Sequence, residues 1–382
     1  MPILQTKDIK IALVHDFLVD FGGAERVLEI LSEMFPEAPI YTLLYDKEKM
    51  RGRFSKKVVH ASFLQKFPRF LRRSKKWLLP LMPVAPEIFD LRDFDLVISS
   101  SGAWSKGIVT RVNTIHVSYI HSPMRFVWDA NSEYLGQQKK IWGLGLCARF
   151  VMNYLRIWDK VAADRPDFLV AISKYTQKRI KKYYSRESAV IYPPVAQDTG
   201  YKIQDTNKSQ IPNTKCFLIV SRLSPYKKID MVVEAFNKLG LPLVVIGEGQ
   251  QEKYLKSIAA ENVKIMGYQS DEKIAEYYAG ARAFVFAGVD DFGIAPVEAM
   301  AHGVPVLAIR KGGVLEIVEE GKTGEFFDAA TPEVIADGVR RFVENEKSYD
   351  KQAVMESVER FGKDRFIKEF GEYIDNILKP KA

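Results

Sequence analysis

The chain has 382 residues but only two cysteines and no long hydrophobic run. Cys147 and Cys216 stand far apart, with no C-x-x-C pair beside either, so a small disulfide scaffold is excluded and the sequence does not favour a structural zinc site. No segment approaches the roughly 18 apolar residues that a membrane-spanning helix needs. Residues Met1–Lys10 lack the apolar core of a secretory signal, so we expect none.

Acidic residues are missing from one long segment, because Lys49–Pro86 contains eleven Lys or Arg and no Asp or Glu. The whole chain has a net charge of +8. Residues 1–200 hold 31 basic and 20 acidic side chains, and the remainder holds 25 and 28. The net charge is therefore +11 in the first part and −3 in the rest. A basic excess favours nucleic acid, an anionic membrane surface or a phosphorylated ligand, and here it is confined to the first part.

Hydrophobic residues make up 47% and charged residues 27% of the chain, which is typical of a globular protein of two or three domains. Short β-type runs alternate with helical patterns, beginning with a strand over 9–14 and a helix over 24–34. The further strands that we expect are 96–99, 115–120, 168–172, 189–192, 216–220, 243–246, 263–266, 283–286 and 304–309. This alternation predicts an α/β protein with doubly wound parallel sheets.

A polar segment divides the chain. Pro193–Pro194 ends a strand run, and about twenty mostly polar residues follow Val195, which is typical of an interdomain linker. We therefore expect domains over 1–195 and 196–360. A C-terminal helix within 361–382 is expected to cross back to the first domain.

The second half contains a turn suited to anions. Arg222 and Lys227 flank a strand-to-helix turn, where the helix N-terminus and two cations would hold a diphosphate. The same pattern also fits two surface cations at a helix start. Further along, Asp290–Pro305 follows another strand and opens a helix that carries Glu298. The carboxylates of Asp290 and Glu298 are both suited to accept hydrogen bonds from sugar hydroxyls.

These residues resemble the retaining GT-B glycosyltransferases of family 4. Members of that family carry an arginine in a G-R-L type turn, a lysine five residues later, and an E-x7-E motif around F-G-x-x-P-x-E-A. Arg222 and Lys227 keep the first spacing, and Glu298 matches the second glutamate. Asp290 replaces the first glutamate, and Lys228 replaces the glycine that usually follows the lysine. The resemblance covers essentially the whole chain and implies two Rossmann-like domains facing a central cleft.

The resemblance also implies a role for each matched residue. Arg222 and Lys227 neutralise the donor diphosphate and the leaving nucleotide, and Glu298 binds the ribose. The other positions expected to contact the donor sugar or base are Asp290, Gly293, Ile294, Ala295, Gly247, Glu248 and Tyr268. Such enzymes need no metal or other cofactor, so we interpret Asp93–Phe94–Asp95 as the start of a strand.

The first half offers two further positions. Gly22–Gly23 opens the first helix, and in the family this loop approaches the donor phosphates. His121 follows a strand, and the resemblance places it near the donor sugar, although a structural histidine fits the pattern too. His15–Asp16 invites a comparison with metal-dependent hydrolases, but no cluster of further ligands supports it.

Aromatic and aliphatic residues are mixed with the cations of residues 49–86, and a similar mixture recurs over 139–158. This combination is typical of an element that binds an anionic membrane surface, although a solvated basic face over an ordinary core is the alternative. We therefore expect a cytoplasmic enzyme, peripheral on the inner face of the membrane.

Taken with the family resemblance, the sequence predicts transfer of a hexose with retention to a lipid-linked glycan. The early H-D-F-L…G-G-A-E-R-V-L string and D-F-G-I-x-P-V-E-A are similar to bacterial mannosyltransferases of surface-polysaccharide assembly, which favours GDP-mannose as the donor. A UDP-sugar donor is the alternative within this class. A sugar-nucleotide epimerase and a basic nucleic-acid-binding protein are the alternatives outside it, although no nucleic-acid motif is present.

Overall fold

The computed structural model describes residues 9–73, 77–129, 144–195 and 215–379. Contacts divide the chain into two units, Met1–Pro194 with Phe366–Ala382, and Val195–Arg365. The sequence had suggested boundaries after residues 195 and 360. Most of the last helix, α13 (Lys363–Leu378), belongs to the first unit. There the rings of Phe366 and Phe370 lie 5.8 and 6.0 Å from the ring of Tyr119.

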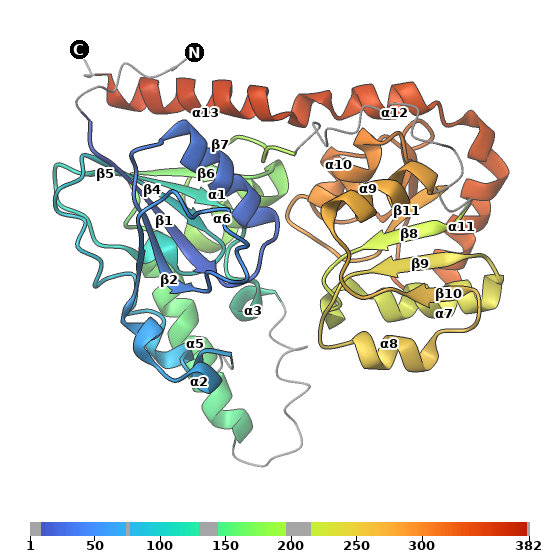
Figure 1. The fold of residues 1–382 in the computed structure, drawn as a ribbon, viewed down its shortest axis with the longest axis horizontal. Helices are drawn as coiled ribbons and strands as arrows, with labels where there is room; N and C mark the ends of the chain where they lie inside the picture. The colour runs from blue at the N-terminus through green and yellow to red at the C-terminus, as the bar shows by residue number, and fades with distance from the viewer. Residues whose placement is uncertain (1–8, 74–76, 130–143, 196–214, 380–382) are drawn as a thin grey trace. The chain divides into compact units, whose positions relative to one another are not determined.

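The first unit is built on a seven-stranded parallel sheet in the order β3-β2-β1-β4-β5-β6-β7 (Figure 1). Its strands are β1 (Ile11–Leu18), β2 (Ile40–Tyr45), β3 (Val59–Ala61), β4 (Leu96–Ser101), β5 (Ile115–Ile120), β6 (Phe168–Ala171) and β7 (Ala189–Val190). The strand order reverses between β1 and β4. In such sheets the crevice at the carboxyl ends of these two strands is where ligands bind.

Helices cover both faces of this sheet. They are α1 (Gly23–Met34), α2 (Arg69–Arg73), α3 (Arg125–Trp128), α5 (Leu144–Ala162) and α6 (Lys174–Tyr184), with 3-10 turns η1 (Phe63–Lys66), η2 (Leu79–Leu81) and η3 (Ser105–Gly107). Helix α1 buries Val27, Leu28 and Leu31 at helical spacing, as the sequence predicts. Ser173 caps the N-terminus of helix α6, and its hydroxyl accepts the N–H of Thr176 at 2.9 Å.

The second unit repeats the pattern with six parallel strands in the order β10-β9-β8-β11-β12-β13. These strands are β8 (Phe217–Val220), β9 (Leu243–Ile246), β10 (Val263–Ile265), β11 (Ala283–Phe286), β12 (Val306–Ile309) and β13 (Gly324–Phe327). Here the order reverses between β8 and β11. Both units are therefore doubly wound Rossmann-like domains, as the sequence predicts.

The helices of the second unit are α7 (Ile229–Leu239), α8 (Glu252–Ile258), α9 (Asp271–Gly280), α10 (Ile294–Ala301), α11 (Pro332–Asn345) and α12 (Lys351–Ser357). Its 3-10 turns are η4 (Pro225–Lys227), η5 (Gly313–Glu316), η6 (Glu346–Ser348) and η7 (Glu359–Phe361). Val232 of α7 and Val339 of α11 share a core cluster with Phe217 and Ile219 of β8. Leu218, which faces the other way, is also fully buried, so both faces of the sheet are covered.

Three strands escaped the sequence analysis, namely β2, β3 and β13. Strand β3 is only three residues long, and β13 begins with Gly324 and Glu325, which are poor strand formers. Strand β1 also runs four residues beyond the predicted end, through His15 and Asp16, because other parts of the unit satisfy both polar side chains. Within the residues that the structure describes, no helix is both long and apolar enough to span a bilayer.

Candidate active site

The cationic turn predicted in the second half lies at the switch point of the second sheet. Arg222 follows β8 and is exposed, and Lys227 ends η4 directly before α7. The ammonium group of Lys227 forms an ion pair with the carboxylate of Asp290, which follows β11. These three predicted residues therefore come from the two strands that flank the reversal. An ion-paired lysine beside a helix N-terminus is a ready partner for an anion.

Lys228 has an unusual backbone for a residue with a side chain. Its φ of 54° and ψ of 32° lie in the left-handed region, where a Cβ is strained. It joins the end of η4 to the start of α7 and stands where the family resemblance expects glycine. The turn therefore has, at a lysine, a backbone conformation that glycine adopts without strain.

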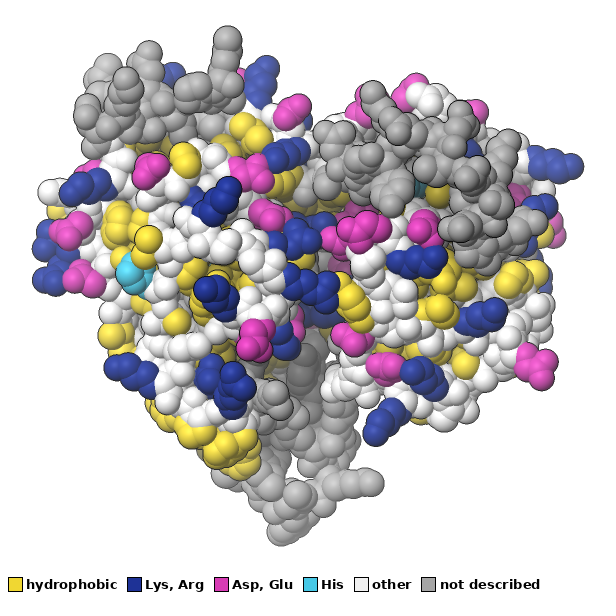
Figure 2. Space-filling view, viewed as in Figure 1, with side chains coloured by type: hydrophobic (Ala, Val, Ile, Leu, Met, Phe, Trp, Pro, Cys, Tyr) yellow, Lys and Arg dark blue, Asp and Glu magenta, His cyan; other side chains and the backbone are white. Residues whose placement is uncertain are grey.

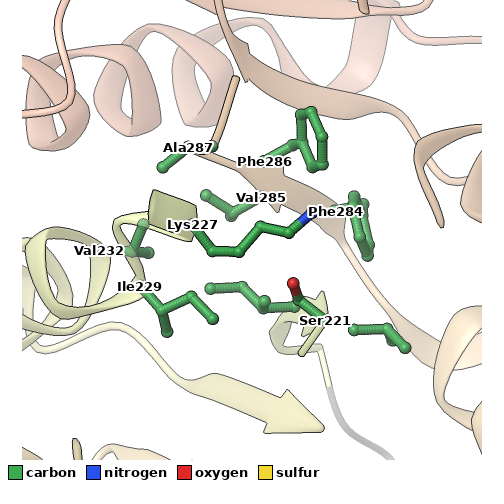
Figure 3. Close-up of a pocket in the computed structure, with 11 residues that line it drawn as sticks. Ser221, Lys227, Ile229, Val232, Phe284, Val285, Phe286 and Ala287 are labelled. Carbon is green, nitrogen blue, oxygen red and sulfur yellow. The ribbon is translucent and has the colours of Figure 1, made fainter. Parts of the chain in front are cut away.

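The close-up in Figure 3 shows what lies beneath the turn. The side chain of Lys227 runs past the end of β11, and its ammonium group lies 5.6 Å from the ring of Phe286. The cavity drawn there has a volume of only about 10 Å³. That is roughly the space for one water, so the region beneath the turn, which Lys227 itself lines, is packed interior.

The loop after β11 is held by close backbone packing. The N–H of Gly313 donates to the carbonyl of Asp290 at 2.9 Å, and a Cβ on Gly313 would lie 2.2 Å from the carbonyl of Asp291. A Cβ on Gly312 would lie 2.6 Å from the carbonyl of Asp290. The glycine pair Gly312–Gly313 therefore supports the loop that carries Asp290.

Helix α10 carries the remaining predicted donor residues of this loop. Gly293 caps it with φ 127°, and Ile294 and Ala295 form its first turn. Glu298 lies one turn further on and is partly buried. The hydroxyl of Tyr278 on α9 donates to its Oε2 at 3.4 Å. The ring of Tyr278 stacks on that of His302 at 5.2 Å, so α9 and α10 together orient Glu298.

The three positions predicted to contact the base, Gly247, Glu248 and Tyr268, differ in their exposure and in their packing. A Cβ on Gly247, at φ 137°, would lie 1.9 Å from the carbonyl of Ser221, so this glycine lets β9 approach the cationic turn. The carbonyl of Glu248 accepts the N–H of Leu223 at 2.9 Å, while its side chain is exposed. Tyr268 is 49% exposed and follows Gly267, which itself has φ 70°. Gly247 has a packing role whether or not it contacts a ligand.

In the first unit, the glycine loop and His121 belong to one hydrogen-bonded group. Gly22 caps α1, and its N–H donates to Oε2 of Glu25 at 2.9 Å, while Gly23 begins the helix. His121 follows β5, and its Nε2 lies 2.7 Å from the hydroxyl of Ser100. The sequence analysis missed Glu25 and Ser100. The three-residue spacing of Gly22 and Glu25 is typical of a capping box and was a usable signal.

Asp16 has a structural role that the sequence analysis also missed. Its carboxylate accepts the N–H groups of four consecutive residues, at 2.9, 2.6, 3.0 and 2.7 Å: Gly102, Ala103, Trp104 and Ser105. It therefore fixes the turn after β4. Among the described residues, no group of three or more His, Cys, Asp or Glu is arranged to hold a metal ion.

Each unit is a doubly wound sheet of the kind that binds ligands at its switch point, and the second unit has a cationic turn and a carboxylate-bearing helix there. The comparisons with known proteins are specific. A family model described as "Glycosyl transferases group 1" matches residues 202–356, and one described as "Glycosyltransferase Family 4" matches residues 21–198. The chain is therefore a group 1 glycosyltransferase with the GT-B fold, and the nucleic-acid and epimerase alternatives give way to it.

Individual relatives are also described as glycosyltransferases, at low sequence identity. The glycosyltransferase MJ1178 of Methanocaldococcus jannaschii is 22% identical over 350 residues, covering 89% of this chain and 90% of that protein. A GDP-mannose-dependent mannosyltransferase of Mycobacterium tuberculosis is 27% identical over 201 residues, covering 46% of this chain and 52% of that protein. The crystal structure of Anabaena Alr3699/HepE with UDP-glucose has a TM-score of 0.68 at 18% identity, covering 96% and 100% of the two chains.

Proposed function

We propose that this glycosyltransferase moves a hexose from a nucleoside diphosphate sugar to a hydroxyl acceptor, with retention at the anomeric carbon. The observation that supports this most directly is the ion pair between Lys227 and Asp290, beside Arg222, at the switch point of the second sheet. A diphosphate that enters there replaces the carboxylate as the partner of Lys227. Asp290 is then available to a sugar hydroxyl.

The chemistry follows from the charges. Negative charge grows on the diphosphate as the bond from its oxygen to the anomeric carbon breaks, and Arg222 and Lys227 stabilise that charge. The acceptor oxygen bonds to the anomeric carbon on the same face, and its proton passes to the departing phosphate oxygen. No side chain of the matched motifs stands out as a covalent nucleophile. Because two cations supply the electrostatic stabilisation, we propose no metal or other cofactor.

Our proposed donor is GDP-mannose. It is supported by the mannosyltransferases among the relatives, at 27% and 28% identity in Mycobacterium tuberculosis and Mycolicibacterium smegmatis. The same proposal assigns Glu298 to the ribose and His121 to the hexose. A UDP-sugar is the second candidate, because the structurally similar Anabaena protein was crystallised with UDP-glucose.

We also propose that the acceptor is a lipid-linked glycan reached from the inner surface of the membrane. Within residues 49–86, Phe70 and Trp77 are 69% and 75% exposed, beside the cations of α2. Helix α5 carries a second exposed stripe at helical spacing: Phe150, Tyr154, Ile157 and Val161. Figure 2 shows hydrophobic side chains gathered over α2 at the lower end of the first unit, with basic side chains nearby. This composition suits an anionic bilayer surface.

A donor panel tests the activity. We expect GDP-mannose to be hydrolysed or transferred and to protect the protein against heat, whereas UDP-glucose has less effect. Lys227→Ala should lower kcat by about a hundredfold to a thousandfold. Glu298→Ala should mainly weaken donor use. Lys238→Ala, which removes an exposed lysine of α7, is the control. Equal activity of Lys227→Ala and Lys238→Ala would contradict the proposal.

Flotation with liposomes that contain anionic lipid tests the membrane proposal. The double variant Arg69→Glu/Arg72→Glu is expected to lose flotation, because both cations belong to α2. The double variant Lys174→Glu/Lys178→Glu changes charge equally on the exposed face of α6 and should float normally. Flotation that is unchanged in the first pair, or lost equally in both, would refute a role for residues 49–86.

A further inference from the structure

A second cavity lies in the first unit, at the edge of the sheet opposite to its switch point. It is an open groove of about 390 Å³, within the range of roughly 300–1,000 Å³ that is typical of ligand sites. One wall is residues 88–92, which precede β4, and the other is residues 109–111, which precede β5. These strands are parallel neighbours (Figure 1). The groove therefore lies at their amino ends, roughly 20 Å from the carboxyl ends, because β4 has six residues.

The floor and the rim of this groove are apolar. Leu91 is 2% exposed and shares a core cluster with Val97 of β4 and with Ile108, so its position is fixed. On the rim, Ile88 and Val109 are 61% and 54% exposed. A single exposed apolar side chain is ordinary, but here such side chains stand on both walls of one groove. The groove thus offers a rigid apolar contact to another side chain.

The charges of the groove are not all paired with one another. Arg92 binds Asp90 through two parallel contacts, Nε to Oδ1 at 2.7 Å and Nη2 to Oδ2 at 2.6 Å. These hydrogen bonds, with a smaller contribution from the charge of Arg111, lower the pKa of Asp90 to about 2. Asp93 also acts on Arg92 but does not line the groove.

Arg111 itself is the cation that remains. Its guanidinium group forms no hydrogen bond and no ion pair with any residue that the structure describes. The Asp90 carboxylate is already taken by Arg92, so the groove has one positive charge in excess. An arginine in this situation suits a carboxylate, which it binds with two parallel hydrogen bonds.

The main chain of the second wall is also available for pairing. Within the described part of the chain, the N–H groups of Val109, Thr110 and Arg111 make no hydrogen bond, and the carbonyls of Val109 and Thr110 accept none. A run of such groups can pair with the backbone of an extended peptide, as the edge of a sheet does. A small molecule or a lipid headgroup would leave most of them to water. The wall therefore favours a peptide.

We propose that this groove binds an extended segment of a partner protein, in which an acidic residue stands beside an apolar one. The carboxylate pairs with Arg111, the apolar side chain packs on Leu91 between Ile88 and Val109, and the backbone pairs with residues 109–111. The proposal depends on neither the donor nor the acceptor of the transferase. Because the groove is at the amino ends of the strands, a bound partner leaves the switch point of this sheet open.

A random heptapeptide library displayed on phage is the probe, with the full-length protein as the target. We expect the selected peptides to place an aspartate or glutamate next to an aliphatic or aromatic residue. A labelled peptide with the consensus sequence should then bind in fluorescence anisotropy. Selection of no peptides, or of peptides without an acidic residue, would overturn the proposal.

Two arginine variants test the charge. Arg111→Glu should weaken binding of the consensus peptide at least about tenfold, because a charge-assisted hydrogen bond is replaced by repulsion. Arg340→Glu makes the same change at an exposed arginine of α11 in the second unit, and should bind as the wild type does. Equal affinities of the two variants would show that the peptide binds elsewhere.

Two valine variants test the apolar contact. Val109→Asp should abolish binding of the same peptide, whereas Val58→Asp, at a valine that is 63% exposed, should leave it unchanged. Both valines are exposed, so circular dichroism is expected to show that both variants are folded. Unchanged binding by Val109→Asp would contradict the placement of the apolar side chain.

Flotation with liposomes that contain anionic lipid distinguishes a peptide site from a membrane contact. Arg111→Glu and Val109→Asp should float as the wild type does. Loss of flotation in these two variants but not in Val58→Asp would show that the groove faces a bilayer, and the peptide proposal would be wrong.

Discussion

The two units have the same sheet order, 3-2-1-4-5-6 in chain sequence, with a seventh strand on the first, yet they hold their switch points by different means. In the first unit, buried polar side chains hold the segments at the switch point together. Asp16 accepts four backbone N–H groups, and His15 and Ser100 bridge neighbouring strands. In the second unit, glycines let backbone segments approach one another, and charged side chains remain partly exposed above them.

This difference suits a division of work. A buried hydrogen-bonded network fixes the positions of the few polar atoms that take part in it. Partly exposed cations on a turn supported by close backbone contacts can neutralise a diphosphate without being fully desolvated first. We therefore expect the replacement of buried polar residues to destabilise the first unit. Replacement of closely packed glycines by larger residues should destabilise the second.

The largest expected effect is at Asp16. Asp16→Ala leaves four backbone N–H groups without their carboxylate, two of them buried, so the free energy of unfolding should fall by about 4 kcal/mol. Asp20→Ala removes an exposed acid a few residues later and should change it by less than about 0.5 kcal/mol. Denaturant unfolding measures both. A loss of stability equal to that of Asp20→Ala would show that the turn after β4 does not depend on Asp16.

The next effect concerns close approach in the second unit. Gly247→Ala places a Cβ 1.9 Å from the carbonyl of Ser221 at φ 137°, so we expect a loss of about 3 kcal/mol from strain and overpacking. Gly240→Ala also lies at positive φ, 68°, but in the left-handed region and with open space around it, and should lose only about 1 kcal/mol. Equal losses in the two variants would mean that the contact with Ser221 has no energetic weight.

The buried histidine of the first unit predicts a pH effect of intermediate size. Burial, aided by the charge of Arg165, lowers the pKa of His116 to about 3, against about 6.5 in an unfolded chain. Below pH 6.5 the unfolded state therefore binds a proton that the folded state does not. The free energy of unfolding consequently decreases as the pH is lowered. Between pH 8 and pH 5 the wild type should lose about 2 kcal/mol more than His116→Gln. Parallel curves for the two proteins would contradict this.

The smallest effect is a gain. Lys228 in the second unit and Ser185 in the first both have positive φ, 54° and 56°. Lys228→Gly and Ser185→Gly should each raise the free energy of unfolding by about 1 kcal/mol, because glycine relieves the strain at the Cβ. Only Lys228→Gly should also weaken the binding of GDP or UDP, since only Lys228 adjoins the cationic turn. Calorimetric titration of both variants with GDP and UDP checks the expected difference in nucleotide binding.

Much of the fold could be predicted because local patterns in the chain carry it. The strands 115–120, 243–246 and 283–286 were predicted with the bounds that the structure has. The last two are continuous apolar runs, and the first alternates apolar residues with His116 and Ser118. The placement of Lys227 near a helix start and of Glu298 on a helix was also predicted, because a helix start after a buried strand is a local feature. The roles of Ser100 and Asp16 were not, since their partners lie 85 and 89 residues away along the chain.

The sequence alone was sufficient for the glycosyltransferase class, the two sheets and the cationic turn. Each depends on hydrophobic periodicity or on motifs within about fifteen residues. Only the tertiary structure showed that Lys227 is paired with Asp290 and that Glu25 connects through two strands to His121. Parallel strands bring distant residues to the same edge of a sheet, and which atoms then meet is set by strand order and register, which no local pattern encodes.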